Sequence, residues 1–441
     1  MKARFLALLG VGGCILASGA GCGTSQTGPA QGQMQDGGTG GGRDAASDGS
    51  TSRGTAPEID GSSTPGDGSS DASPRTTSSP DGSDRDGSGA GSTGLWVTGY
   101  YPSWNDPAND GTYPVTAIDW DGLSDVASAF YIPDGHGGWA SGSFDQTTAK
   151  AVIAAAHDAG KKAIASVGGS NSGATFEQSV ETAKTTFLAN LGALLTLGYD
   201  GIDVDWENGT GANDDADQIA LVEGLRSAHP TTLLTITAGS INENIQPDLT
   251  VYSTVASQVD RINVMTYGMS GAYEGWDSWH SSPLHWNHGS STPAGIDASI
   301  GHYLDAGIPA AKLGVGIGFY GECYTSPVTG PAQALGASTV AAGDGVMTYA
   351  NILANYDSTA AYHYDANAGV PYLTLNGSNA EKCTYVTYED ATSIAAKAAW
   401  VKEKGLGGVI IWSIDEGFVS GGADTAAQNP LLEVTRASFL Q

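Results

Sequence analysis

The stretch at 199–207, "YDGIDVDWE", carries three acidic residues, Asp203, Asp205 and Glu207, at alternate positions with apolar residues between them. In an extended strand, alternate side chains lie on the same face. Carboxylates this close raise one another's proton affinity, which costs stability unless a site uses it. The pattern therefore predicts a strand with an apolar face and a stack of acids on the other, suited to proton transfer.

A metal site is one chemistry that such a stack could serve, since carboxylate oxygens suit magnesium and calcium. The stretch 203–211, "DVDWENGTG", lacks the glycine and the distal glutamate of a calcium loop. His280, His285 and His288 form another group, without the spacing of zinc ligands. We therefore expect neither a metal nor a cofactor.

Glycoside hydrolysis is the other chemistry. Most glycosidases place two carboxylates on opposite sides of the scissile bond. Acids that follow one another on a single strand cannot do so. Glu207, the outermost, could protonate a leaving oxygen if its pKa were raised, and Asp205 beside it would help to raise it. No protein nucleophile is evident, so the substrate must supply one.

Eight short apolar segments recur along the chain, and several follow a helix-like stretch that ends in glycine. Before the fourth segment, Phe187, Leu191, Leu194 and Leu195 form one helical stripe, and Gly198 ends it. The segments are "WVTGYY" (96–101), "VASAFYI" (126–132), "KAIASVGG" (162–169), "GIDVDWE" (201–207), "LLTITAG" (233–239), "INVMTYG" (262–268), "LGVGIGFYG" (313–321) and "GVIIWSI" (408–414).

Apolar strands that alternate with amphipathic helices indicate a parallel sheet. Eight repeats from residue 95 to 441 favour an α/β fold of the (β/α)8 TIM-barrel type. A doubly wound open sheet is the alternative, but it usually has fewer strands. The interval at about 322–387, before the seventh helix, is too long for a loop. It contains "YANILANY" and "GVPYLTLNG", so we expect a small inserted α+β subdomain there.

In such barrels, chemistry gathers where the strands end. Aromatic, small and acidic residues fall at these ends, with no lysine or arginine among them. That lining is typical of a site for a neutral sugar polymer, whose apolar ring faces stack on aromatic side chains. A single aromatic residue at a strand end is more often part of the hydrophobic core, so the prediction of a sugar site rests on the whole set. Its members besides the acids are Tyr100, Tyr101, Trp104, Phe130, Ser166, Gly168, Gly169, Met265, Tyr267, Tyr320 and Trp412.

The N-terminal region predicts export. Residues 1–22 begin with basic residues and continue with a short apolar run, as in a secretory signal peptide. Cys22 follows "LASGAG", which is similar to a bacterial lipoprotein cleavage site, so Cys22 is a candidate for lipidation. Ordinary cleavage and release is the alternative. Residues 23–94 are almost wholly Gly, Ser, Thr, Asp and Pro, which predicts a disordered tether. The protein is thus expected to be secreted or tethered to the cell surface.

Charge and cysteine content limit the partners. From Leu95 onward the chain has 37 acidic and 12 basic residues, a net charge of −25, which argues against nucleic acid or an anionic membrane as a partner. We expect a monomer. Cys323 and Cys383 are the only cysteines in the folded part. In an exported chain they most simply form a disulfide, with two free thiols as the alternative.

Several motifs together resemble family 18 glycoside hydrolases, the chitinase-like enzymes. "DGIDVDWE" (200–207) matches their D-G-x-D-x-D-x-E signature, and "SVGG" (166–169) matches their S-x-G-G. The resemblance covers roughly Trp96 to Glu416. The remaining matches are "MTY" (265–267), "GWDSWHSSPL" (275–284), "VTYED" (386–390) and "GGVIIW" (407–412).

The resemblance implies hydrolysis of chitin or N-acetylglucosamine oligosaccharides by a retaining, substrate-assisted mechanism. Glu207 would be the general acid and base, and Asp205 would hold the substrate's acetamido N–H while Asp203 shares a proton with it. Tyr267 would bind the acetamido oxygen. Trp412 would form the floor of the sugar site, and Trp276 joins the strand-end residues above as a substrate-binding candidate.

This chain departs from the family pattern at three places. Gly268 stands where aspartate is common, Glu322 replaces a common arginine, and "NGTG" (208–211) replaces a Tyr-Pro pair. None lies in the acid stack, so activity is still expected. Two alternatives stay open. An endo-β-N-acetylglucosaminidase shares the chemistry but tends to lack the insertion, and a lectin usually lacks the catalytic glutamate, which is present here.

Overall fold

The computed structural model describes residues 94–109, 111–209, 213–242, 248–285 and 295–441. The signal peptide, Cys22 and all but the last residue of the predicted tether lie outside the described residues, as does His288. Those expectations remain predictions.

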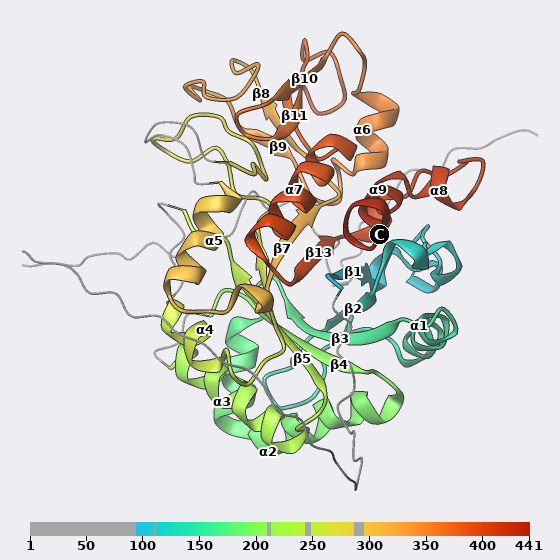
Figure 1. The fold of residues 1–441 in the computed structure, drawn as a ribbon, viewed down its shortest axis with the longest axis vertical. Helices are drawn as coiled ribbons and strands as arrows, with labels where there is room; N and C mark the ends of the chain where they lie inside the picture. Colours follow the sequence, from blue (N-terminus) through green and yellow to red (C-terminus); the bar gives the residue numbers. More distant parts are fainter. Residues whose placement is uncertain (1–93, 110, 210–212, 243–247, 286–294) are drawn as a thin grey trace, which may run out of the picture. The chain divides into compact units, whose positions relative to one another are not determined.

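Eight parallel strands close into a barrel in the order β1-β13-β7-β6-β5-β4-β3-β2, which confirms the predicted (β/α)8 fold and excludes an open sheet. Figure 1 shows the helices outside the strands. The barrel strands are β1 (Trp96–Pro102), β2 (Asp125–Tyr131), β3 (Lys162–Gly169), β4 (Gly201–Trp206), β5 (Leu233–Gly239), β6 (Arg261–Met265), β7 (Leu313–Gly318) and β13 (Gly408–Trp412).

One helix ends where the sequence predicts. α2 ends at Gly198, whose φ of +129° suits glycine, and its Phe187, Leu191 and Leu194 are buried as the stripe predicts. The α-helices around the barrel are α1 (Gln146–Asp158), α2 (Gly173–Leu197), α3 (Asp214–Ala228), α4 (Leu249–Val255), α5 (Ile296–Asp305), α7 (Ala391–Lys404), α8 (Thr425–Gln428) and α9 (Pro430–Phe439). The 3₁₀ turns are η1 (Ser103–Asn105), η2 (Pro107–Asn109), η3 (Val115–Ala117), η4 (Trp120–Gly122), η5 (Ala310–Lys312) and η6 (Ile414–Gly417).

The predicted insertion lies between β7 and α7 and contains a five-stranded antiparallel sheet in the order β10-β11-β12-β8-β9. It is the upper part of the view in Figure 1. Its elements are β8 (Glu322–Thr325), β9 (Val340–Ala342), α6 (Tyr349–Asn355), β10 (Tyr362–Asp365), β11 (Val370–Thr374) and β12 (Cys383–Thr387).

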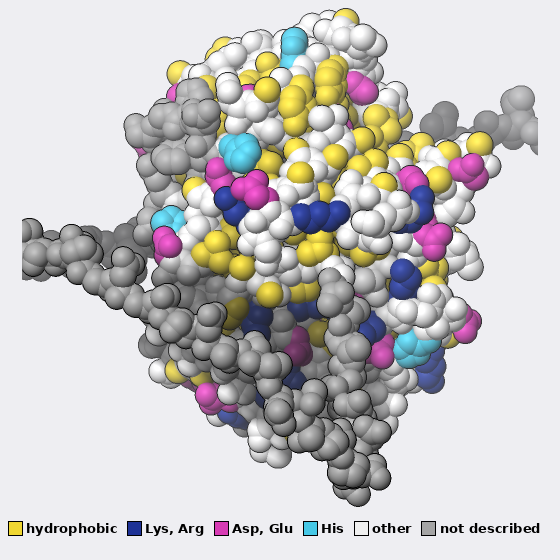
Figure 2. All heavy atoms as spheres, viewed as in Figure 1, with side chains coloured by type: hydrophobic (Ala, Val, Ile, Leu, Met, Phe, Trp, Pro, Cys, Tyr) yellow, Lys and Arg dark blue, Asp and Glu magenta, His cyan; other side chains and the backbone are white. Residues whose placement is uncertain are grey.

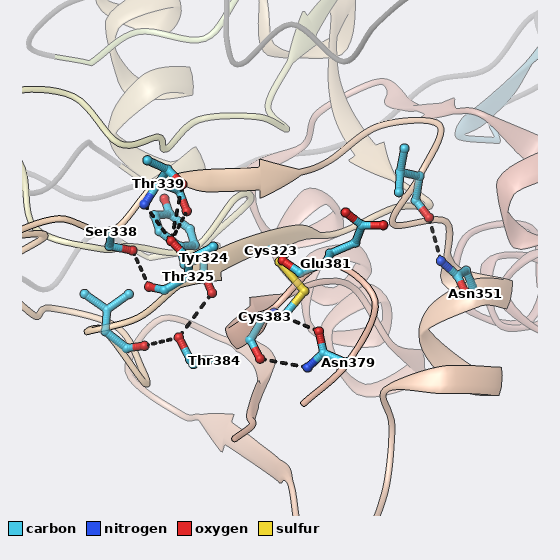
Figure 3. The surroundings of a disulfide bond; sticks show 12 residues. Cys323, Tyr324, Thr325, Ser338, Thr339, Asn351, Asn379, Glu381, Cys383 and Thr384 are labelled. Atoms are coloured by element: carbon cyan, nitrogen blue, oxygen red, sulfur yellow. Dashed lines mark hydrogen bonds between the residues drawn. A yellow bond between two sulfur atoms is a disulfide. The ribbon is translucent and has the colours of Figure 1, made fainter. Parts of the chain in front are cut away.

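A disulfide joins Cys323 of β8 to Cys383 of β12, with the Cα atoms 5.2 Å apart. The Asn379 side chain braces this point, because its Nδ2 donates to the Cys383 carbonyl and its Oδ1 accepts from the Cys383 N–H, each at 2.8 Å (Figure 3). β8 enters the insertion and β12 leaves it. The disulfide therefore forms as predicted and holds the two ends of the insertion together.

The main hydrophobic core lies between the barrel strands and their helices, and a smaller cluster around Tyr100, Ala127 and Ile410 fills the barrel interior. Hydrophobic side chains also gather on the surface over β10, β11 and α6 (Figure 2). Among the described residues, three of the four most exposed large hydrophobic side chains belong to the insertion: Val346, Leu353 and Tyr362. The fourth is Trp104. None of the described helices is long and apolar enough to cross a bilayer.

Candidate active site

The acid stack points into the barrel as the alternation predicts. Ile202, Val204 and Trp206 of β4 belong to the core outside the barrel, and the Trp206 ring stacks on Phe176 with centroids 4.6 Å apart. The acids between them therefore face the barrel interior. Asp203 is 1% exposed and Asp205 3% exposed, while Glu207, just past the strand, is partly buried.

Asp203 is held by three hydroxyl groups from other strands. Its Oδ2 accepts from the Tyr100 and Ser166 hydroxyls, each at 2.8 Å, and its Oδ1 accepts from Thr235. Burial raises the pKa of Asp203, while these donors and the more distant Arg261 act to lower it. Two of the three donors, Tyr100 and Ser166, are residues that the sequence analysis selected.

Asp205 has a sparser set of donors. The Thr237 hydroxyl donates to its Oδ1 at 2.5 Å. Burial is the largest cause that raises the pKa of Asp205 well above its usual value, and the charges of Glu207 and Asp203 raise it further. The acids thus interact as a coupled set, as expected.

Glu207 has a pKa raised to about 7, first by burial and then by the charge of Asp344. From the sequence, Asp205 is the neighbour expected to raise this pKa. Repulsion between two carboxylates is mutual, so the interaction with Glu207 that raises the pKa of Asp205 also disfavours a charge on Glu207. The charge of Asp344, in the insertion, adds to it. A carboxyl group with a pKa near neutrality can both give and take a proton, which a general acid–base requires.

Gly168 and Gly169 let β3 pass close to the acid stack. Both have positive φ, +121° and +97°, which favours glycine. A Cβ on Gly168 would lie 2.0 Å from the Asp205 carbonyl oxygen, and one on Gly169 would lie 2.8 Å from the Phe130 ring. These residues shape the site by their lack of a side chain.

Aromatic rings cluster at the C-terminal ends of the strands around the stack. Phe130 stacks on Trp412 with centroids 5.5 Å apart, and Tyr100 meets Trp412 edge-on at 5.7 Å. Trp104, 49% exposed, lies 6.1 Å from Trp412. Exposed and half-buried rings side by side provide surfaces on which sugar rings can stack.

Tyr267 and Tyr320 complete this side of the site, with ring centroids 6.2 Å apart. Tyr267 and Met265 pack against the same interior cluster as Tyr100. The charges of Asp205 and Glu207 add to burial in raising the pKa of Tyr267, so its hydroxyl keeps its proton and can donate a hydrogen bond.

Trp276 is not among the residues packed in this group. It packs with Tyr324, Val328 and Tyr385 of the insertion, and it contacts Tyr273 edge-on at 4.9 Å. The sequence placed it in the site only through the motif after the sixth strand.

The histidines considered for zinc have other partners. His280 contacts Asp365 and the Tyr385 hydroxyl, at 3.1 and 3.0 Å, and His285 contacts Asp297 at 3.1 Å. The described residues contain no group of three or more His, Cys, Asp or Glu side chains arranged to hold a metal ion.

Gly268 and Glu322, two of the positions where this chain departs from the family pattern, are linked through Ser281. Glu322 is hydrogen-bonded to Ser270 and Ser281, and the Ser281 hydroxyl accepts from the Gly268 N–H at 3.1 Å. Burial raises the pKa of Glu322 to about 7. In the third departure, 208–211, residues 210 and 211 lie outside the described part of the chain.

Sequence reasoning missed four residues of the site. Thr235 and Thr237 lie at alternate positions in the next strand, as the acids do in theirs. This alternation could have identified them from the sequence. Glu416 directly follows Asp415 after the last strand, a weaker signal. Asp344 lies in the insertion, far along the chain from the stack, and no local pattern marks it.

Comparison with known proteins places the chain in a family. The model described as glycosyl hydrolases family 18 matches residues 97–417. Chitinase A1 of Niallia circulans is 32% identical over 309 residues, covering 61% of this chain and 42% of that protein. Chitotriosidase-1 of Mus musculus is 30% identical over 307 residues, covering 62% of each chain.

A solved structure agrees in fold. The group IV chitinase of Ostrinia furnacalis matches with a TM-score of 0.67 at 24% identity, covering 79% of this chain and 100% of that one. The chain belongs to glycosyl hydrolase family 18, as the motifs indicated. It spans 42% and 62% of the lengths of the two sequence relatives above.

Proposed function

We propose that this protein is a chitinase that hydrolyses β-1,4 links between N-acetylglucosamine units with retention of configuration. The observation that carries the proposal is Glu207, a carboxyl group with a pKa of about 7 at the outer end of a buried acid stack. The surrounding aromatic rings and the chitinases among the relatives support a chitin-like substrate.

In the first step, Glu207 donates its proton to the glycosidic oxygen, and the bond from that oxygen to the anomeric carbon breaks. The carbonyl oxygen of the substrate's own acetamido group attacks the anomeric carbon and closes an oxazolinium ring. Asp205 accepts a hydrogen bond from the acetamido N–H and stabilises its growing positive charge, while Tyr267 donates to the acetamido oxygen.

In the second step, the Glu207 carboxylate takes a proton from water as the water oxygen attacks the anomeric carbon. The ring opens, the acetamido group is restored, and Glu207 is protonated for the next cycle. Two displacements at the same carbon return the β-configuration. Asp203, held by its three hydroxyl donors, stays in place beneath Asp205 and exchanges a proton with it.

The test is hydrolysis of chitin oligosaccharides by the wild type and by Glu207→Gln, with the product anomer read by NMR before mutarotation. We expect the β-anomer from the wild type and at least a 10²–10⁴-fold lower rate from the variant. An α-anomer would refute retention. A folded wild type that cleaves no chitin oligosaccharide at acidic or neutral pH would favour glycan-core hydrolysis or a lectin instead.

Export, and tethering through a lipid on Cys22, form a second part of the proposal. It rests on the composition of residues 1–94 alone. Mass spectrometry of the protein from its membrane and medium fractions tests it: a lipid on an N-terminal Cys22 would establish the tether, and release without that modification would exclude it.

A further inference from the structure

Two carboxyl groups from distant parts of the chain meet beside Trp412. Asp344 follows β9 in the insertion, and its Oδ2 accepts from the Trp412 indole N–H at 3.0 Å. Glu416 lies in η6, and its Oε1 accepts from the Gly345 N–H at 2.7 Å. Gly345 directly follows Asp344, so this bond brings the Glu416 carboxyl group beside that of Asp344, close enough for each group to affect the pKa of the other.

The segment that carries Asp344 is fixed to the barrel. The Gly321 N–H donates to the Met347 carbonyl at 2.8 Å, and the Tyr349 N–H donates to the Phe319 carbonyl at 2.9 Å. Both bonds join the segment to the end of β7. Asp344 is therefore held at the end of the barrel by backbone bonds, independently of its own side chain.

Two buried carboxyl groups held side by side favour a proton on one of them, because two ionised carboxylates have no hydrogen to share and repel each other. Glu416 is 3% exposed, and its Oε2 meets no N–H or O–H donor among the residues that the structure describes. A proton on Glu416, donated to Asp344, satisfies both groups. Burial and the charges of Asp344 and Asp415 raise the pKa of Glu416 well above its usual value, which agrees with this assignment.

The pair lies at the candidate active site, because Trp412, which donates to Asp344, packs against Phe130 and Tyr100 with ring centroids 5.5 and 5.7 Å away. The charge of Asp344 acts on Glu207, Tyr267 and Tyr320, at the ends of β4, β6 and β7, and on Asp415 beside Glu416. Each of these groups is acidic or phenolic. A negative charge on Asp344 therefore favours the protonated form of each.

We propose that Asp344 and Glu416 share one proton, so that the pair holds a single negative charge that positions the Trp412 indole and keeps the proton on the catalytic acid. The role in catalysis rests on the proposed function, with Asp344 and Glu416 as positioning residues. The insertion then contributes to the chemistry directly, in addition to any contact with the polymer.

The test compares Asp344→Asn and Glu416→Gln, which keep side-chain shape. Asparagine can accept from the Trp412 N–H but carries no charge, so Glu207 loses its proton more easily. We expect the upper pH limit of kcat near 7 in the wild type, because the pKa of Glu207 is about 7, and this limit should fall by roughly one pH unit in Asp344→Asn. In Glu416→Gln the amide N–H replaces the shared proton and Asp344 keeps its charge, so this limit should stay within about 0.3 units.

A matched control removes one charge elsewhere: Glu223→Gln on the exposed face of α3 should leave the limit unmoved. An unmoved limit in Asp344→Asn would overturn the proposal, even if KM rose, because a purely structural contact changes affinity and not titration. If the upper pH limit of kcat fell as far in Glu416→Gln as in Asp344→Asn, the proposal would also be overturned, since Glu416 would then carry the charge.

A measurement without turnover keeps the pair testable if the variants fold poorly or the wild type proves inactive on chitin. Carboxyl-carbon NMR of the wild type at pH 7 should show one protonated carboxyl group that is assigned to Glu416 or Asp344 by its loss in either variant. Two ionised signals for these residues would refute the shared proton. An inactive wild type with the protonated signal would refute only the proposed function.

Discussion

Buried acids at the two ends of the barrel have different kinds of partner. At the N-terminal end, Asp125 of β2 is 1% exposed and contacts Arg261 of β6 at 2.7 Å, across the barrel interior. Arg261 also lies over the Trp96 ring, 4.8 Å from its centroid. At the C-terminal end, Asp203 and Asp205 are equally buried, but their direct partners are hydroxyl groups.

The difference separates an acid with a structural partner from acids whose protonation the proposed mechanism uses. An arginine partner holds a carboxylate in its ionised form and prevents useful proton exchange. Hydroxyl donors orient a carboxyl group while leaving its charge uncompensated, so burial raises its proton affinity. The same residue type at the two ends of one barrel therefore serves structure in one place and, in the proposed mechanism, proton transfer in the other.

The largest expected effect comes from Asp205→Asn at the C-terminal end. The amide cannot stabilise the charge on the acetamido group, so kcat on chitin oligosaccharides should fall about 10²–10³-fold. The melting temperature should stay the same or rise, because a buried acid beside two others is removed. Initial rates and thermal unfolding measure both; a large loss of stability with retained kcat would reverse the contrast between the two ends.

The matched substitution at the other end is Asp125→Asn. It leaves the largely buried Arg261 charge without its anion, and should lower the free energy of unfolding by about 3 kcal/mol. The kcat of the folded protein should change little, because neither residue lies at the C-terminal end. Denaturant unfolding and rates below the melting temperature check this. A 10²-fold fall in kcat without loss of stability would show that the two ends are not separate.

Removing the disulfide tests whether the insertion contributes to stability and activity separately from the two ends of the barrel. Cys323→Ser with Cys383→Ser should cost ~2–4 kcal/mol in stability. We expect a larger loss of activity on long chitin polymers than on short analogues, because the ends of the insertion are no longer held together. Parallel assays on both substrates decide this, and equal losses would argue that the insertion does not contact the distal part of the polymer.

Glu322→Gln should have the smallest effect, and one that depends on pH. Glu322 is 7% exposed and its pKa is raised to about 7. The folded protein therefore binds a proton that the unfolded chain releases near its ordinary value of 4.5, so stability is full at low pH and falls as pH rises through 7. The glutamine variant should lack this fall and be ~2 kcal/mol more stable than the wild type at pH 8.

At pH 4 the wild type and Glu322→Gln should differ little in stability. That comparison controls for the effect of replacing a protonated carboxyl group by an amide. Melting temperatures across this pH range provide the measurement. An equal difference at both pH values would mean that packing, and not ionisation, distinguishes the variant.

Much of the fold followed from local patterns. The eight strands, the helix stop at Gly198 and the insertion were predicted, because strand alternation, helical stripes and glycine at positive φ act over a few residues. The partners of Trp276 could not be predicted in this way. Its ring packs with the insertion, because packing depends on residues far along the chain, and its role in substrate binding stays a prediction.

The sequence by itself determined that three acids share one face of a strand, that the strand belongs to a (β/α)8 barrel, and that the motifs are those of family 18. Only the tertiary structure decided which groups surround each acid. Burial, hydroxyl donors from other strands and the charge of Asp344 set the proton affinities, and these depend on distances in space. For this reason Glu207 could be predicted as a site residue from the sequence, whereas Asp344 and Glu416 could not.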